Sequence, residues 1–185
     1  MKKLLLLTTI AIIGITSSIS AQNVDIGFKI GLNISNFTGG DVDRNNLFDF
    51  HVGGLAEIKI NEKFSLQPEL LYTRQGSDAE NSIKIKVDYL AIPLMVKYYV
   101  SKKFGIEAGP QLSFLVNDKA KFNDSSIPDV ETDASSVDFG LNIGFGYSIN
   151  THLFAQVRYN YGITTVVENP DIKNSVFQIS MGYKI

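Results

Sequence analysis

The sequence predicts an all-β protein that crosses a membrane as an up-and-down antiparallel barrel of about eight strands. Three observations predict this fold. A segment typical of exported proteins precedes a chain in which apolar residues recur at every second position. Polar connections of alternating length separate the segments that show this pattern. Glycines gather on their polar side, where a narrow barrel interior requires small residues.

Residues 1–21 have the three regions of a secretory signal peptide. Two lysines form a positive start, an apolar run extends from Leu4 to Ile15, and small residues lead to Ala21. The apolar run is shorter than the roughly 20 residues that a spanning helix needs. We expect cleavage after Ala21, which leaves residues 22–185 as one outer-membrane β-barrel domain.

Composition restricts the partners of the mature chain. It has no Cys, so it must fold without disulfides and cannot be a lipoprotein acylated on Cys. Without residues 1–21, fifteen basic residues stand against nineteen acidic ones, a net charge of −4. This mild acidity argues against a nucleic-acid partner, which a basic patch would indicate. We expect a monomer surrounded by outer-membrane lipid.

Eight segments alternate with period two, as strands with two unlike faces do. In the first, Ile26, Phe28 and Ile30 are apolar, while Gly27 and Lys29 between them are small or polar. The segments are Val24–Ile34, Val52–Ile60, Phe64–Tyr72, Leu90–Val100, Phe104–Val116, Val137–Ile149, Leu153–Ile163 and Val176–Ile185. The fourth can begin at Ile83, where the apolar residues change phase, so we expect a bulge near Tyr89.

The connections alternate between short and long. Brief turns at 61–63, 101–103 and 150–151 alternate with longer polar loops at 35–50, 77–82, 117–135 and 164–175. Transmembrane barrels have short periplasmic turns and long external loops. The sequence therefore places the four polar loops outside the cell.

A soluble barrel with an apolar ligand cavity would show the same alternation turned inside out. Two sets of residues argue against it. The polar face carries ten of the 15 glycines, namely Gly27, Gly31, Gly53, Gly105, Gly109, Gly140, Gly144, Gly146, Gly162 and Gly182. The apolar face carries aromatics near both strand ends, namely Phe64, Phe104, Tyr147 and Tyr183 near the turns, and Tyr72, Phe114, Phe139, Tyr161 and Phe177 near the loops. Two aromatic belts are typical of outer-membrane barrels.

Residues 89–99 (YLAIPLMVKYY) and 105–110 (GIEAGP) resemble the PorT-like outer-membrane β-barrel proteins, a group of small barrels of the porin family. The likeness extends over the mature chain in strand number and loop asymmetry, while the specific motif covers the fourth and fifth strands. The resemblance implies a barrel without an assigned function. It also suggests a link to a protein secretion system, with which the name-giving member is associated.

The last strand, residues 178–185 (QISMGYKI), resembles the C-terminal signal that the barrel assembly machinery reads. It has apolar residues at the last and third-last positions, although Ile185 stands where an aromatic is usual. The resemblance implies that this machinery is a partner during insertion.

Charged residues of both signs fall on the inward face. They are Lys29, Glu57, Lys59, Glu69, Lys97, Glu107, Arg158 and Asp138, together with Gln67, Gln111, Asn142 and Gln156. Because buried charges must be paired, the pattern predicts an internal network that fills the barrel. Lys97 and Glu107 lie symmetrically about the turn at Lys102, which predicts that they are cross-strand neighbours. A proton relay or selectivity ring is the alternative, although rings for one kind of ion carry one sign of charge.

The sequence indicates no catalytic, cofactor or metal site. The two histidines, His51 and His152, fall at opposite ends of their predicted strands, too far apart to share a site. Asp41 and Asp43 open like a calcium loop, but Asn46 stands where Gly is required and Val52 where Glu is required. We therefore expect solvated loops and no enzyme.

The leading hypothesis is a non-enzymatic outer-membrane barrel with a filled interior and a structural or surface-interaction role, whose external loops meet an unknown partner. A narrow pore or a conduit for a small apolar ligand is an alternative, because apolar residues also face inward. They are Leu55, Leu71, Met95, Leu115 and Phe154. A second alternative, an accessory of a protein secretion system, rests on the family resemblance alone.

Overall fold

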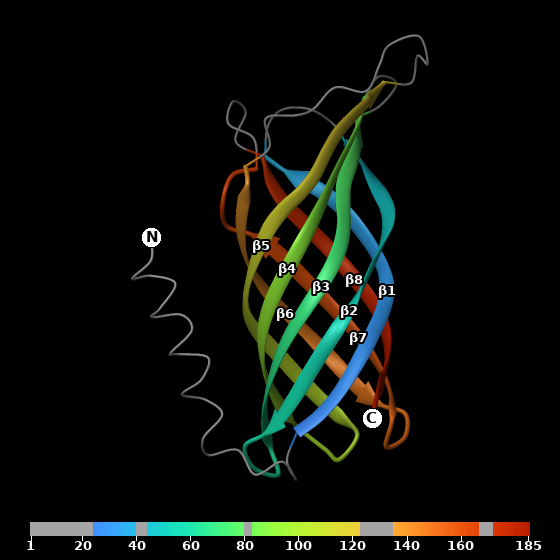
Figure 1. Ribbon diagram of the computed structural model, residues 1–185, viewed down its shortest axis with the longest axis vertical. Coiled ribbons are helices and arrows are strands. Elements are labelled where there is room, and N and C mark those ends of the chain that lie inside the picture. The colour runs from blue at the N-terminus through green and yellow to red at the C-terminus, as the bar shows by residue number, and fades with distance from the viewer. Residues whose placement is uncertain (1–23, 40–43, 80–82, 123–134, 167–171) are drawn as a thin grey trace.

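The computed structural model describes residues 24–39, 44–79, 83–122, 135–166 and 172–185, which form a closed eight-stranded antiparallel barrel (Figure 1). Each strand pairs with the next, and β8 returns to pair with β1. The strands are β1 (Val24–Thr38), β2 (Arg44–Lys59), β3 (Phe64–Ala79), β4 (Ile83–Tyr99), β5 (Phe104–Phe122), β6 (Val137–Ser148), β7 (Leu153–Gly162) and β8 (Lys173–Lys184). The predicted fold class is confirmed.

The barrel is apolar outside and polar inside. In β1, Ile26 and Ile30 are 60% and 58% exposed, whereas Lys29 between them is completely buried. All nine aromatics of the two predicted belts lie on the outer face, where lipid removes the need to bury them from water. No helix in the described part of the chain is long and apolar enough to cross a membrane.

The strands extend farther toward the loops than the alternation predicts. β2 begins at Arg44, eight residues before the expected start, and β5 continues to Phe122. The polar residues Asn45 and Asn46 resemble a loop in sequence, but their backbones pair with β3. Outside the lipid, backbone hydrogen bonds to the neighbouring strand are enough to maintain a strand. Its outward residues there do not need to be apolar. In Figure 1, β3, β4 and β5 rise above the rest of the barrel as a stem.

The bulge expected near Tyr89 is confirmed. The β4–β5 register shifts between Asp88 and Tyr89, which leaves Val116 as an extra residue in β5. On the turn side of Tyr89, the even-numbered apolar residues of β4 such as Ile92 face outward; on the loop side, the odd-numbered Val87 is completely buried inside. The regular run of apolar residues in β4 therefore changes from the outward to the inward face at this point.

Several expected features fall outside the described residues. These are the signal peptide at 1–21, the aspartates Asp41 and Asp43, and most of the acidic loop between β5 and β6. The described ends of the same loops belong to strands, so the regular part of the chain is larger than predicted.

Interior glycines allow close approach of the large inward side chains. A Cβ at Gly31 would collide with the ring of His51, and one at Gly182 would collide with the ring of Phe154. Gly31 and Gly182 are therefore needed because the ring of the paired residue on the neighbouring strand packs directly against their backbone.

Candidate functional site in the barrel interior

A buried ion cluster occupies the middle of the barrel. Arg158 donates through Nη1 and Nη2 to both carboxylate oxygens of Glu69, at 3.0 and 2.8 Å, and through Nε to Glu107 at 2.9 Å. Lys29 Nζ lies 2.8 Å from Glu69 and also donates to Gln156 at 2.8 Å. Gln156 in turn donates to Glu107 at 2.6 Å. Two cations and two carboxylates thus balance, and all four are at most 4% exposed.

The members of this central cluster come from alternate strands. Lys29 is on β1, Glu69 on β3, Glu107 on β5, and Arg158 on β7. Inward residues of alternate strands lie at similar heights in a tilted barrel, so they meet as one layer. The cluster therefore joins opposite walls through side chains alone.

A second cluster lies nearer the short turns and is centred on Glu57. Its carboxylate accepts hydrogen bonds from Lys184 and Tyr99 and lies 3.4 Å from Lys97. Lys97 also donates to Gln67 at 2.8 Å. These donors come from β8 and β4, and Glu57 from β2, so the even strands form this layer. The cluster carries two cations against one carboxylate.

His51 is buried, which corrects its expected place at the rim. Its Nδ1 lies 2.8 Å from Asn33 Oδ1 and its Nε2 2.8 Å from Ser180 Oγ. The error arose from the late predicted start of β2, which put His51 at a strand end. Because Asn33 Oδ1 can only accept, Nδ1 carries the proton and Ser180 donates to Nε2.

The order Asn33, His51, Ser180 resembles a nucleophile with its base and orienting group. All three residues are at most 2% exposed. Asn33 Nδ2 also donates to Thr73 and to two backbone oxygens of other strands. A substrate could reach these side chains only by disrupting this packing. We interpret the arrangement as a buried hydrogen-bond network that joins the strands. Among the described residues, no three His, Asp or Glu side chains form a metal-binding group.

An apolar plug closes the loop end of the interior. It consists of Phe37, Val87, Tyr89, Val166 and Ile172, each at most 6% exposed, with Ile85 and Leu115 packed against it. Val166 N donates to Ile172 O at 2.7 Å, so the two ends of the loop between β7 and β8 are held together. Sequence reasoning missed this plug, apart from Leu115, because its members lie outside the regular alternation or in predicted loops.

Lys59 and the pair formed by Lys97 and Glu107 depart from expectation in different ways. Lys59 does not belong to the interior network: its side chain is 51% exposed and pairs with Asp25 at 2.9 Å. It is the last residue of β2, where the barrel opens to water. Lys97 and Glu107 are cross-strand neighbours as predicted, but their charged ends turn to other partners, Glu57 and Arg158.

Asp138, the remaining predicted charge, lies in a separate group near the loops. It accepts hydrogen bonds from Thr164 and Asn174. Sequence reasoning missed Lys184 and Tyr99, although both follow the inward phase of their strands.

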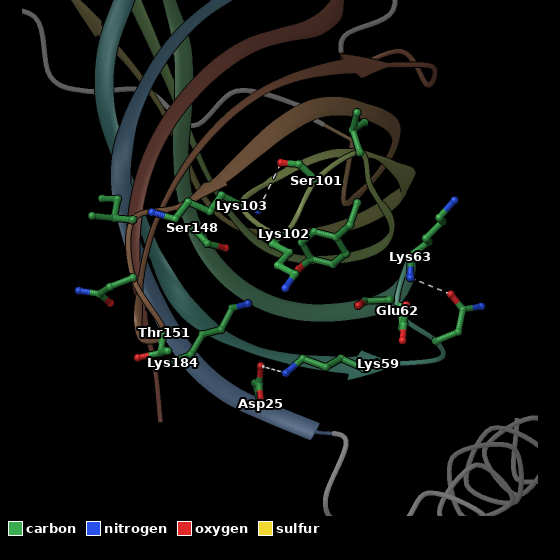
Figure 2. A pocket seen from close by; sticks show the side chains of 16 residues that line it. Asp25, Lys59, Glu62, Lys63, Ser101, Lys102, Lys103, Ser148, Thr151 and Lys184 are labelled. Carbon is green, nitrogen blue, oxygen red and sulfur yellow. Dashed lines mark hydrogen bonds and ion pairs between the residues drawn. The ribbon is translucent and has the colours of Figure 1, made fainter.

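The turn end of the barrel opens into a basin of about 1240 Å³. Five lysines line it, Lys59, Lys63, Lys102, Lys103 and Lys184, against the two carboxylates of Asp25 and Glu62. Figure 2 shows Lys102 and Lys184 extending into the basin from different walls, and Lys59 meeting Asp25 at its edge. Tyr99 and Lys184 line its inner end and both donate to the buried Glu57 behind them.

Three solved structures show a similar fold. Neisserial surface protein A (NspA) shares 16% identity at a TM-score of 0.64, over 86% of this chain and 97% of that one. Ail of Yersinia pestis, in complex with the heparin analogue sucrose octasulfate, shares 15% at 0.57, over 88% and 99%. OprG of Pseudomonas aeruginosa shares 14% at 0.51, over 88% and 96%. No curated protein matches the chain in sequence.

The sequence itself matches a family model across most of its length. The model is described as an outer membrane protein beta-barrel domain and matches residues 20–168. This match places the protein in the cell outer membrane, in agreement with the lipid-facing exterior and the closed barrel. The chain therefore belongs to the family of outer membrane protein beta-barrel domains.

Proposed function

We propose that this protein is a closed, non-enzymatic outer-membrane barrel that acts through the surface it presents at its ends, above all through its external loops. The observation that carries this proposal is the filled interior. From the turns to the loops, the interior holds the Glu57 cluster, the central ion cluster and the apolar plug. The side chains that form the ion pairs of the two clusters are at most 11% exposed.

The stem gives this proposal a physical basis at the loop end. β3 continues seven residues beyond Tyr72, which at about 3.3 Å per residue corresponds to roughly 23 Å along the strand. Ion pairs join the strands in this region. Arg74 Nε on β3 lies 3.0 Å from Asp88 on β4, and Lys86 on β4 lies 3.6 Å from Asp49 on β2. A barrel that served only as a membrane plug would not need paired strands so far outside the lipid.

The alternative of a pore or apolar conduit is less well supported. Leu55, Leu71, Met95 and Phe154 are at most 5% exposed and pack inside the barrel. Membership of the PorT-like group, and with it a role beside a secretion system, is a finer proposal that rests on residues 89–99 and 105–110. The loop partner remains to be identified by cross-linking in intact cells.

Planar-bilayer recording of the refolded protein tests the closed interior. We expect no steady ohmic conductance, because an ion would have to displace Arg158 from two carboxylates. The control is Glu62→Gln, which removes the same negative charge at the exposed turn end and should leave the trace flat. A reproducible channel whose conductance changes in Glu69→Gln would refute the proposal and support the pore.

A further inference from the structure

We propose that the basin at the turn end binds an acidic peptide segment of a periplasmic protein. Short turns face the periplasm in outer-membrane barrels, so this basin opens away from the cell surface. The inference therefore concerns the end of the molecule opposite to the external loops.

The charge of the basin is the first support. The whole chain has a formal net charge of −2, yet the residues that line the basin carry five lysines and two carboxylates. Lys59 is neutralised by Asp25, and Lys184 shares Glu57 with Lys97. Among the described residues, Lys63, Lys102 and Lys103 have no ion-pair partner. Such a local excess of one sign, held in a concave site, attracts ligands of opposite charge.

A buried hydroxyl without a partner is the second, independent support. Ser65 lines the basin and is completely buried, and its Oγ makes no hydrogen bond of normal length and angle among the described residues, although the Tyr99 hydroxyl lies near it. A buried hydroxyl that makes no hydrogen bond is destabilising, so its presence needs an explanation. A ligand carboxylate that accepts from Ser65 would supply the missing partner.

The shape and the donor types favour a peptide over other anions. The basin is bordered by the three short turns and the strand ends next to them, whereas the headgroups of the lipid leaflet surround the outside of the barrel. Arginine forks and nests of backbone N–H groups recognise phosphate, and no arginine is among the lining residues. Lysine amines on separate turns suit carboxylates that are spaced along an extended chain.

Fluorescence anisotropy with a labelled hexaglutamate peptide tests the proposal on the folded protein in discs of zwitterionic lipid. We expect salt-sensitive binding of hexaglutamate and none of hexaglutamine. Lys102→Gln should weaken binding roughly two- to fivefold, the range that corresponds to one exposed charge pair. Lys173→Gln, which makes the same charge change at the loop end, is the matched control and should bind as the parent does.

Ser65→Ala provides a readout that a purely structural role would not change. It should weaken peptide binding without lowering the free energy of unfolding, because the serine hydroxyl makes no hydrogen bond of normal length and angle in the free protein. Equal binding by Lys102→Gln and Lys173→Gln would overturn the proposal. So would displacement of the peptide by inorganic phosphate at matched charge, or binding that occurs only in discs with phosphatidylglycerol, since these results would indicate a phosphate or lipid site.

Discussion

Replacing Arg158 with Met should destabilise the barrel by about 3–5 kcal/mol, the cost of removing one partner from a buried ion pair. The guanidinium makes three charge-assisted hydrogen bonds to two carboxylates. Without it, Lys29 alone must balance both Glu69 and Glu107, and the central cluster acquires a net charge of −1. Native proteins are stable by only about 5–15 kcal/mol, so this loss is a large part of the total.

A second substitution separates charge imbalance from lost packing. Glu107→Gln in the Arg158→Met background returns the cluster to one cation and one carboxylate, and the new amide oxygen can still accept from Gln156. We expect the double variant to cost less than the sum of the two single variants by about 1–3 kcal/mol, the usual coupling of residues that share a network.

The assay is denaturant unfolding in lipid vesicles followed by far-ultraviolet circular dichroism, because the chain contains no Trp for fluorescence. The different migration of boiled and unboiled samples on a gel verifies that each variant is folded. Lys59→Gln is the control, since its pair with Asp25 is exposed and worth about 0–1 kcal/mol. Additive losses within about 0.5 kcal/mol would refute the reasoning, because they would show that Arg158 and Glu107 do not act together.

Two further predictions concern the packing of the interior and the orientation of the barrel. Gly182→Ala should cost about 1–3 kcal/mol in the same unfolding assay, because a Cβ there collides with the ring of Phe154 and with a backbone oxygen. Gly54→Ala, whose Cβ would meet only a backbone oxygen at 3.8 Å, should change stability by less than about 0.5 kcal/mol, and an equal loss in both would contradict the packing argument. Because the chain has no Cys, single-cysteine labelling can report orientation: Thr38→Cys should react with a membrane-impermeant maleimide in intact cells, and Ser101→Cys only after lysis. The reverse result would place the lysine basin outside the cell.

The parts of the fold that touch lipid could be predicted closely from sequence. β6 was expected at Val137–Ile149 and is found at Val137–Ser148, and β7 was expected to begin at Leu153, where it does. Lipid requires an apolar residue at every outward position, so the period of two persists wherever the strand is in the membrane. Outside the lipid, the outward residues no longer need to be apolar. The start of β2 and the end of β5 lie there and could not be predicted from the alternation.

The interior shows a different limit. Alternation indicates which residues face inward, and the symmetric turn at Lys102 identified Lys97 and Glu107 as neighbours. It does not indicate which charges meet, because Arg158 and Glu69 lie 89 positions apart on β7 and β3, which are not paired in the sheet. Their contact depends on the tilt and register of the whole closed barrel.

The same dependence explains what the network contributes to closure of the barrel. The pairing of β1 with β8 closes the barrel, and interior bonds join residues on both sides of it: Asn33 Oδ1 accepts from Gln178, and His51 contacts Ser180. Farther toward the turns, Lys184 on β8 reaches Glu57 on β2, past β1. An open sheet would leave these groups unpaired in a region without water, at several kcal/mol per charge. The polar interior therefore favours the closed barrel over any partly paired sheet.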